Sequence, residues 1–148
     1  MRVSEAMSRE VRIASPQQSI ADAAQIMAEM DIGSLPVGQD DRLVGMITDR
    51  DIALRGVGRG CAPDTKVADV MTKDIKYCFE DEDLAHVAKN MGDVQVRRLP
   101  VVNRQKRLVG IVSLGDVALE AQPRHSAETL RKVSEPGGQH GQSLGGMR

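Results

Sequence analysis

Aromatic residues are nearly absent from this sequence. It contains no Trp, and Tyr77 and Phe79 are its only Phe, Trp or Tyr residues. Proteins that bind single-stranded nucleic acid commonly stack the bases on aromatic side chains, so the composition argues against that class. A buried core must instead be built from Val, Ile, Leu and Ala, together with eight Met, whose flexible side chains fill irregular space.

Clustered metal ligands and long apolar runs are missing as well. Cys61 and Cys78 form no CxxC pair, and His86, His125 and His140 are scattered. A structural zinc site needs four clustered nitrogen or sulfur ligands, so we expect no metal. Isolated cysteines suit the reducing cytosol, and no stretch has the character of a signal peptide or a membrane span. The sequence therefore predicts a cytoplasmic protein with no membrane partner.

Neither sign of charge dominates. The 148 residues carry 20 basic and 21 acidic side chains, and the basic ones form no continuous stripe. Without a basic face, we expect no binding to nucleic acid or to an anionic membrane surface. A hydrophobic content of 41% is that of a globular chain, and the length is sufficient to bury a core.

An internal repeat organises the chain. Shifted by 64 positions, Leu35–Val37 falls on Leu99–Val101. One extra residue then enters the second copy, and at an offset of 65 Arg42–Ala53 falls on Arg107–Ala118 with six identities in twelve pairs. Such a register indicates two copies of one supersecondary unit. The expected organisation is repeats at 3–56 and 67–122, a flexible linker at 57–66, and a tail at 123–148 with one short helix in an otherwise disordered segment.

Each copy has the pattern of a β-α-β-β-α unit. A short apolar strand precedes a helix with one apolar face, which begins at Ser19 in the first copy and at Asp83 in the second. Two strands joined by a polar turn follow, and a second helix closes the copy. The predicted strands are Val11–Ile13, Leu35–Val37, Leu43–Thr48, Ile75–Phe79, Leu99–Val102 and Leu108–Ser113, and the predicted closing helices are Asp49–Arg55 and Leu114–Ala121. The fold class is therefore α/β.

A hydroxyl residue begins each closing helix, and an aspartate follows three positions later, in Thr48–Asp51 and Ser113–Asp116. One interpretation is structural, since this pattern caps a helix and suits its positive end. The other is a ligand site, since a helix N-terminus binds anions and a carboxylate accepts hydrogen bonds from sugar hydroxyls. Gly45 and Gly110, three residues before the hydroxyls, would leave room for a ligand to approach the strand.

These features together resemble a known family. Two copies of about 60 residues, each with a Leu-Pro-Val strand and a Gly-φ-φ-(Thr/Ser)-x-x-Asp motif (φ apolar), resemble a pair of cystathionine-β-synthase (CBS) domains over about residues 3–118. The resemblance implies two β-α-β-β-α repeats related by a pseudo-twofold axis and packed through their small sheets, with ligand clefts between them. It also implies a homodimer that binds AMP, ADP, ATP or a related adenosyl ligand.

The resemblance assigns roles to particular residues. Asp51 and Asp116 would bind ribose, and Thr48 and Ser113 would bind phosphate. The base pocket would be lined by the entering strands and the Leu-Pro-Val strands, at Arg12, Ile13, Lys76, Tyr77, Pro36 and Pro100. Arg50 would add charge to the first site and Arg97 and Arg98 to the second, so we expect the two sites to differ in phosphate affinity.

The leading hypothesis is a regulatory module that senses adenine nucleotides, needs no cofactor and acts on an unidentified protein. Two alternatives stay open. In one, the chain is a ligand-independent dimerisation or scaffold module whose motifs are only helix caps. In the other, it binds NAD or S-adenosylmethionine. We do not expect an enzyme, because no nucleophile or acid–base grouping is evident.

Overall fold

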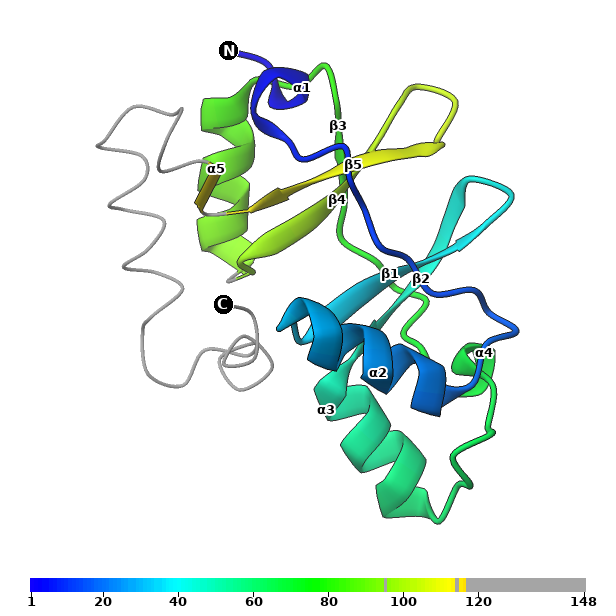
Figure 1. Ribbon diagram of the computed structural model, residues 1–148. Helices are drawn as coiled ribbons and strands as arrows, with labels where there is room; N and C mark the ends of the chain where they lie inside the picture. The colour runs from blue at the N-terminus through cyan, green and yellow to red at the C-terminus, as the bar shows by residue number, and fades with distance from the viewer. Residues whose placement is uncertain (95, 114, 117–148) are drawn as a thin grey trace. The chain divides into compact units, whose positions relative to one another are not determined.

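Two units divide the chain, and each is described by itself. The computed structural model describes residues 1–94, 96–113 and 115–116. The β1–β2 unit spans Arg12–Ile75, and the β3–β5 unit combines Met1–Val11 with the described residues from Lys76 to Asp116 (Figure 1). Both are mixed α/β, so the predicted fold class is confirmed.

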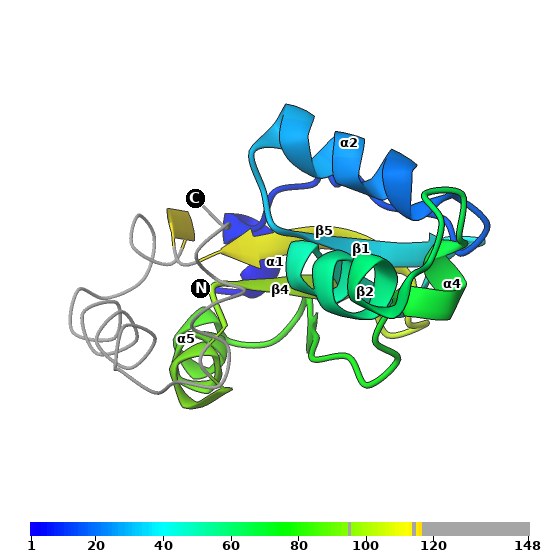
Figure 2. The ribbon, with the colours of Figure 1, turned by 90° about the horizontal axis from the view of Figure 1, so that it is seen from below.

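The β1–β2 unit is built on one antiparallel hairpin. Its elements are α2 (Ile20–Met30), β1 (Ser34–Gln39), β2 (Arg42–Thr48), α3 (Asp49–Asp51), a π-helical turn (Ile52–Gly56), a 3-10 turn (Val57–Arg59) and α4 (Val67–Val70). Ala14 pairs in parallel with Val37 at one edge of the hairpin, and Thr72 pairs with Met46 at the other. Figure 2 shows α2 running along one face of this hairpin.

The β3–β5 unit repeats this plan with a fuller sheet. Its elements are α1 (Val3–Ala6), β3 (Cys78–Phe79), α5 (Leu84–Val94), β4 (Arg98–Val102) and β5 (Leu108–Ser113). The strand order is β3-β4-β5, with β3 parallel and β5 antiparallel to β4. Ser8 pairs with Ile111 at the outer edge of β5. The register bulges at Val101/Val102 as it does at Val37/Gly38 in the other unit.

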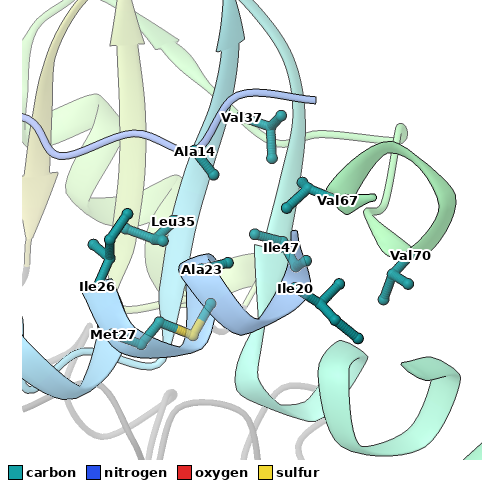
Figure 3. Close-up of a cluster of buried hydrophobic side chains, with 10 residues drawn as sticks. All are labelled: Ala14, Ile20, Ala23, Ile26, Met27, Leu35, Val37, Ile47, Val67 and Val70. Carbon is teal, nitrogen blue, oxygen red and sulfur yellow. The ribbon is translucent and has the colours of Figure 1, made fainter. Parts of the chain in front are cut away.

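Helix α2 forms because its start is capped and one of its faces is apolar. The Ser19 hydroxyl accepts a hydrogen bond from the Asp22 amide at 3.0 Å, which pairs one of the free N–H groups of the first turn. The buried face of α2 consists of Ile20, Ala23, Ile26 and Met27 and packs with Leu35, Val37 and Ile47 of the hairpin (Figure 3). Each fully buried large aliphatic side chain stabilises the unit by about 1.5–3 kcal/mol.

The two repeats exchange their leading segments. Helices α1 and α4 were not among the predicted elements, and Val3 and Val67 within them are fully buried. Although α1 opens the first repeat, it lies in the β3–β5 unit, and α4 lies in the β1–β2 unit. The Ile20 amide at the start of α2 donates to the carbonyl of Thr65 at 2.8 Å. Each compact unit therefore contains the leading segment of the other repeat.

This exchange overturns the interpretation of Gly45 and Gly110 as room for a ligand. A Cβ on Gly45 would lie 2.7 Å from Met71 Sδ and 3.0 Å from the carbonyl oxygen of Thr72. A Cβ on Gly110 would lie 2.6 Å from Met7 Sδ and 2.8 Å from the carbonyl oxygen of Ser8. Glycine is needed at both positions because an exchanged segment crosses the strand there.

The extra residue of the second repeat lies in its hairpin turn. Asp40 and Asp41 both have positive φ, 53° and 64°, as in a two-residue turn of the kind that matches strand twist. In the β3–β5 unit the Asn103 amide donates to the Arg107 carbonyl, which leaves three residues in the turn, and only Lys106 has positive φ. A two-residue turn in one unit and a three-residue turn in the other explain the change of offset from 64 to 65.

Several predicted boundaries need correction. The strand expected at Val11–Ile13 is a single bridge at Ala14, and the strand expected at Ile75–Phe79 is only Cys78–Phe79. The helix expected at Asp49–Arg55 continues through its π-helical and 3-10 turns to Arg59.

The linker expected at 57–66 is not simply flexible, since its end hydrogen-bonds to the start of α2. The predicted helix Leu114–Ala121 and the tail at 123–148 lie outside the described residues, apart from positions 115 and 116. No helix in the described part of the chain is both long and apolar enough to cross a membrane.

Candidate functional site

The first hydroxyl–aspartate turn is a complete helix cap. The Thr48 hydroxyl accepts from the Asp51 amide at 3.0 Å, and Asp51 Oδ2 accepts from the Thr48 amide at 3.0 Å. This reciprocal pair satisfies two backbone donors at the point where β2 turns into α3. The Asp51 side chain is 18% exposed, so the carboxylate is held in place and still partly accessible.

Two arginines accompany this turn. Arg50 is exposed on α3, and its amide donates to Asp49 Oδ1 at 2.8 Å. Arg55 was not predicted as a site residue, yet its Nε lies 3.8 Å from Asp51 Oδ1. The signal that could have identified Arg55 is its spacing, because residues four apart on a helix lie side by side.

The second turn has the same backbone geometry and a different hydroxyl role. Asp116 Oδ2 accepts from the Ser113 amide at 2.9 Å and from the Ser113 hydroxyl at 3.1 Å. The same hydroxyl oxygen lies 3.3 Å from the Asp116 amide, from which it accepts. The structural interpretation is thus correct for both motifs: each caps the backbone that follows its strand.

Strand pairing brings one further residue beside each hydroxyl, and in the second unit it is the predicted Arg98. Ser34 pairs with Thr48 at the open end of the first hairpin, and Arg98 pairs with Ser113 at the end of the second. Side chains directly opposite in an antiparallel pair lie on the same face of the sheet. Arg98 is therefore placed beside Ser113, whereas the matching position of the first repeat holds the buried Ser34. Arg97, just outside β4, is half-buried.

The predicted base-lining residues follow the other edge of each Leu-Pro-Val strand. The carbonyl of Pro36 accepts from the Ala14 amide at 2.9 Å, which fixes the segment holding Arg12 and Ile13 beside β1. Both side chains are exposed. The pairing of Cys78 with Val101 fixes Lys76 and Tyr77 beside β4 in the same way, next to the buried Pro100.

The predicted site residues thus fall into two groups, one in each unit. The β1–β2 unit holds Arg12, Ile13, Pro36, Thr48, Arg50 and Asp51, and the β3–β5 unit holds Lys76, Tyr77, Pro100, Arg97, Arg98, Ser113 and Asp116. Within each unit the hydroxyl–aspartate turn lies on one strand of the hairpin and the base-lining segment runs beside the other strand.

Electrostatic features cluster around β3. Arg104 forms two hydrogen bonds to Asp81, of 2.8 and 2.7 Å, and its guanidinium lies 4.2 Å from the centre of the Phe79 ring. The hydrogen bond from Arg104 lowers the pKa of Asp81. Burial, and then the charge of Glu82, raise the pKa of Cys78 from 9.0 to about 12. That thiol stays protonated at neutral pH and is a core residue, not a nucleophile.

Metal ligands do not gather in the part of the chain that the structure describes. There, no three His, Cys, Asp or Glu side chains lie close enough to hold an ion.

Comparison with known proteins identifies the fold family. The profile of the CBS domain matches residues 3–57 and 67–122. The CBS domain-containing protein YhcV of Bacillus subtilis is 39% identical over 125 residues, which cover 84% of this chain and 89% of YhcV.

Solved structures agree with this match. Hypoxic response protein I, crystallised with two coordinated zinc ions, has a TM-score of 0.73 at 35% identity over 82% of this chain and all of its own. CBSX2 in complex with AMP has a TM-score of 0.71 at 28% identity over 81% of this chain and 95% of its own. The CBS domain pair of MJ0100 with 5-methylthioadenosine and S-adenosylmethionine has a TM-score of 0.68 at 31% identity over 80% and 94%. The chain belongs to the CBS domain family and carries two CBS domains in tandem.

Proposed function

We propose that this chain is a regulatory module without catalytic activity that binds an adenine nucleotide, AMP, ADP or ATP, at its two hydroxyl–aspartate turns. The observation that carries the proposal is the recurrence of one geometry in two units. A carboxylate is held against the end of a strand by the backbone amide of a hydroxyl residue, beside a Leu-Pro-Val strand. The AMP complex of a related CBS structure supports the choice of ligand.

The chemistry of each turn suits a nucleoside phosphate. Each aspartate uses Oδ2 in its cap, so Oδ1 can accept hydrogen bonds from ribose hydroxyls. In the first site Arg55 lies on the same side of the carboxylate. The Thr48 hydroxyl accepts from the Asp51 amide and has no acceptor for its own proton among the described residues. That proton can be donated to a phosphate oxygen.

The two turns differ in phosphate affinity under this proposal. The Ser113 hydroxyl already donates to Asp116 and must rotate to reach a phosphate. The first site adds Arg50 from α3, and the second adds Arg98 from β4 with Arg97 before it. We therefore expect one stronger and one weaker site, the stronger at Thr48–Asp51.

The wider role belongs to the same proposal. The module would act in the cytoplasm as a homodimer, with repeats at 3–56 and 67–122, and would report nucleotide levels to a partner protein. The resemblance to CBS pairs supports the assembly, and the repeat register supports the boundaries.

Calorimetric titration tests the ligand assignment. Wild type, Asp51→Ala and Asp116→Ala are titrated with AMP, ADP, ATP, NAD and S-adenosylmethionine. Asp22→Ala is the matched control, since it removes a first-turn carboxylate of α2 that belongs to neither turn. We expect adenine nucleotides to bind and each site variant to lose one binding event. Failure of every ligand to bind wild type, or unchanged binding in both site variants, would sink the proposal.

The scaffold alternative is favoured by one observation, that both caps are complete without a ligand. It predicts that no adenosyl ligand raises the melting temperature of the wild-type protein. A ligand bound at a hundred times its Kd would raise stability by about 2.7 kcal/mol, which thermal unfolding detects easily. The complex of MJ0100 with S-adenosylmethionine is the reason for testing that ligand in the same titration, since this chain could bind another adenosyl compound instead.

A further inference from the structure

Arg55 joins two parts of the β1–β2 unit that are distant in sequence. Its Nη2 donates a hydrogen bond to the carbonyl oxygen of Val70, the last residue of α4. Its Nε lies 3.8 Å from Oδ1 of Asp51. One guanidinium therefore contacts the first hydroxyl–aspartate turn and the C-terminal end of α4, which lies beside the helical turn that holds Arg55 (Figure 3).

The contact with Val70 is chemically favourable. The last carbonyl groups of a helix lack partners within the helix, and a cation at that end interacts well with the helix dipole. The contact with Asp51 is incomplete, because 3.8 Å is too long for a hydrogen bond. Nε is buried and has no hydrogen-bond partner among the described residues. A small movement of the carboxylate toward Nε would complete the pair, so the positions of Asp51 and Arg55 depend on each other.

The stretch that follows α4 is joined to the strand leading into the site. Thr72 and Met46 exchange two backbone hydrogen bonds, of 2.8 and 2.9 Å, and Met71 packs onto Gly45 of the same strand. We call Val67–Thr72 the α4 segment. It contacts β2 directly and contacts Asp51 through Arg55.

We propose that Arg55 is a positioning residue that couples ligand binding at Asp51 to the α4 segment. The inference rests on the proposed function, because it requires a ligand whose hydroxyl groups use the Asp51 carboxylate. Such hydroxyls fix the carboxylate, the fixed carboxylate holds Nε, and Nη2 then holds the carbonyl of Val70. By linkage, whatever stabilises the α4 segment also strengthens binding at Asp51.

The coupling belongs to the first repeat alone. At the offset of 65, the residue that corresponds to Arg55 is Glu120, which lies beyond the described residues and carries the opposite charge. Asp116 therefore has no basic residue at the fourth position after it, and the two sites would report their occupancy differently.

Titration with AMP and amide hydrogen exchange test the coupling in the full chain. Arg55→Met removes the charge and keeps the length of the side chain. Arg59→Met is the matched control, since Arg59 is exposed at the end of the same helical stretch. In wild type, AMP should slow exchange at the amides of Met71 and Thr72. Arg55→Met should weaken AMP binding at the first site by about fivefold and abolish that slowing, and Arg59→Met should change neither.

Arg55→Lys separates charge from geometry. Its ammonium keeps the charge near Asp51 but cannot serve two distant acceptors at once. It should recover most of the AMP affinity without the exchange response, and it serves as the test if Arg55→Met does not fold.

The outcomes separate the two proposals. Wild type that binds no AMP or other adenosyl ligand would overturn the proposed function and the coupling with it. Wild type that binds AMP while the Arg55 variants keep its affinity and its full exchange response would overturn the coupling alone.

Discussion

The two hydroxyl–aspartate turns share one backbone arrangement and differ in the source of positive charge around it. The first has Arg50 and Arg55 on the helix that follows the turn, and the strand opposite contributes the buried Ser34. The second has Arg98 on the strand opposite. Repetition has thus preserved the hydrogen bonds that terminate the strand, while the charge around them has varied. The units share the hydrogen bonds of the turn, and they differ in where basic side chains lie around it.

The largest expected contrast between the units concerns their thiols. Cys78 takes the place in the β3–β5 unit that Ala14 takes in the other, and burial raises its pKa from 9.0 to about 12. The raised pKa lowers the fraction of Cys78 present as thiolate at neutral pH, and the thiolate is the form that reacts. Cys61 is partly exposed. Labelling with iodoacetamide, followed by peptide mass spectrometry, should modify Cys61 first and Cys78 only in denaturant.

Equal labelling of the native protein at both thiols would contradict this. It would mean that β3 opens readily and that the two sheets are not equally packed.

The next contrast tests whether the exchanged segments fit both units equally tightly. Gly45→Ala and Gly110→Ala place a Cβ within 2.7 and 2.6 Å of a methionine sulfur and against a backbone carbonyl that cannot move away freely. Each should lower the free energy of unfolding by about 2 kcal/mol, with the larger loss at Gly110. Urea denaturation measures both.

Gly38→Ala is the control for this pair, because the nearest atom there is the flexible Cδ1 of Ile13 at 3.1 Å. If all three variants lowered the free energy of unfolding by the same small amount, the close approach of the exchanged segments would not be the reason for glycine at positions 45 and 110.

Sequence periodicity was enough to predict the local architecture. The apolar face of α2, the Leu-Pro-Val strands and the hydroxyl–aspartate turns all depend on contacts within one copy, and the repeat register shows them twice. The exchange of leading segments could not be predicted in this way. Ser8 pairs with Ile111, whose counterpart in the first copy is Met46. Because the two copies are alike, the local pattern around Ser8 fits either strand equally well.

The same limitation applies to the site. The sequence does not show that the space beside Gly45 is filled, because the segment that fills it, at Met71, is distant in sequence. The contact between Arg55 and Val70 could not be predicted because the two residues are also distant in sequence. The sequence identifies the residues around each hydroxyl–aspartate turn within one copy and does not identify those that a distant segment brings beside them.

A smaller contrast concerns the caps. Thr48→Ala and Ser113→Ala should each lower stability by about 1 kcal/mol, since each leaves a backbone amide without its acceptor. Urea denaturation should show similar losses. Titration with AMP should show a larger loss of affinity for Thr48→Ala, whose hydroxyl is free to donate. Equal loss of affinity in the two variants would contradict the proposal that the two sites differ in phosphate affinity.

The smallest effect belongs to the ion pair between Asp81 and Arg104. The two-residue turn of the other unit consists of Asp40 and Asp41 and contains no arginine. The hydrogen bond from Arg104 lowers the pKa of Asp81, so its stabilising effect is present above the unfolded pKa of about 3.9. It is lost as pH falls through the lower pKa of the folded state.

NMR titration of the Asp81 carboxyl should show the pKa return toward its ordinary value in Arg104→Gln and stay low in Lys106→Gln. A pKa that stayed low in both would assign the shift to Arg2 and the backbone instead. Because both side chains are exposed and the pair is screened by salt, it distinguishes the two turns without explaining why either unit folds.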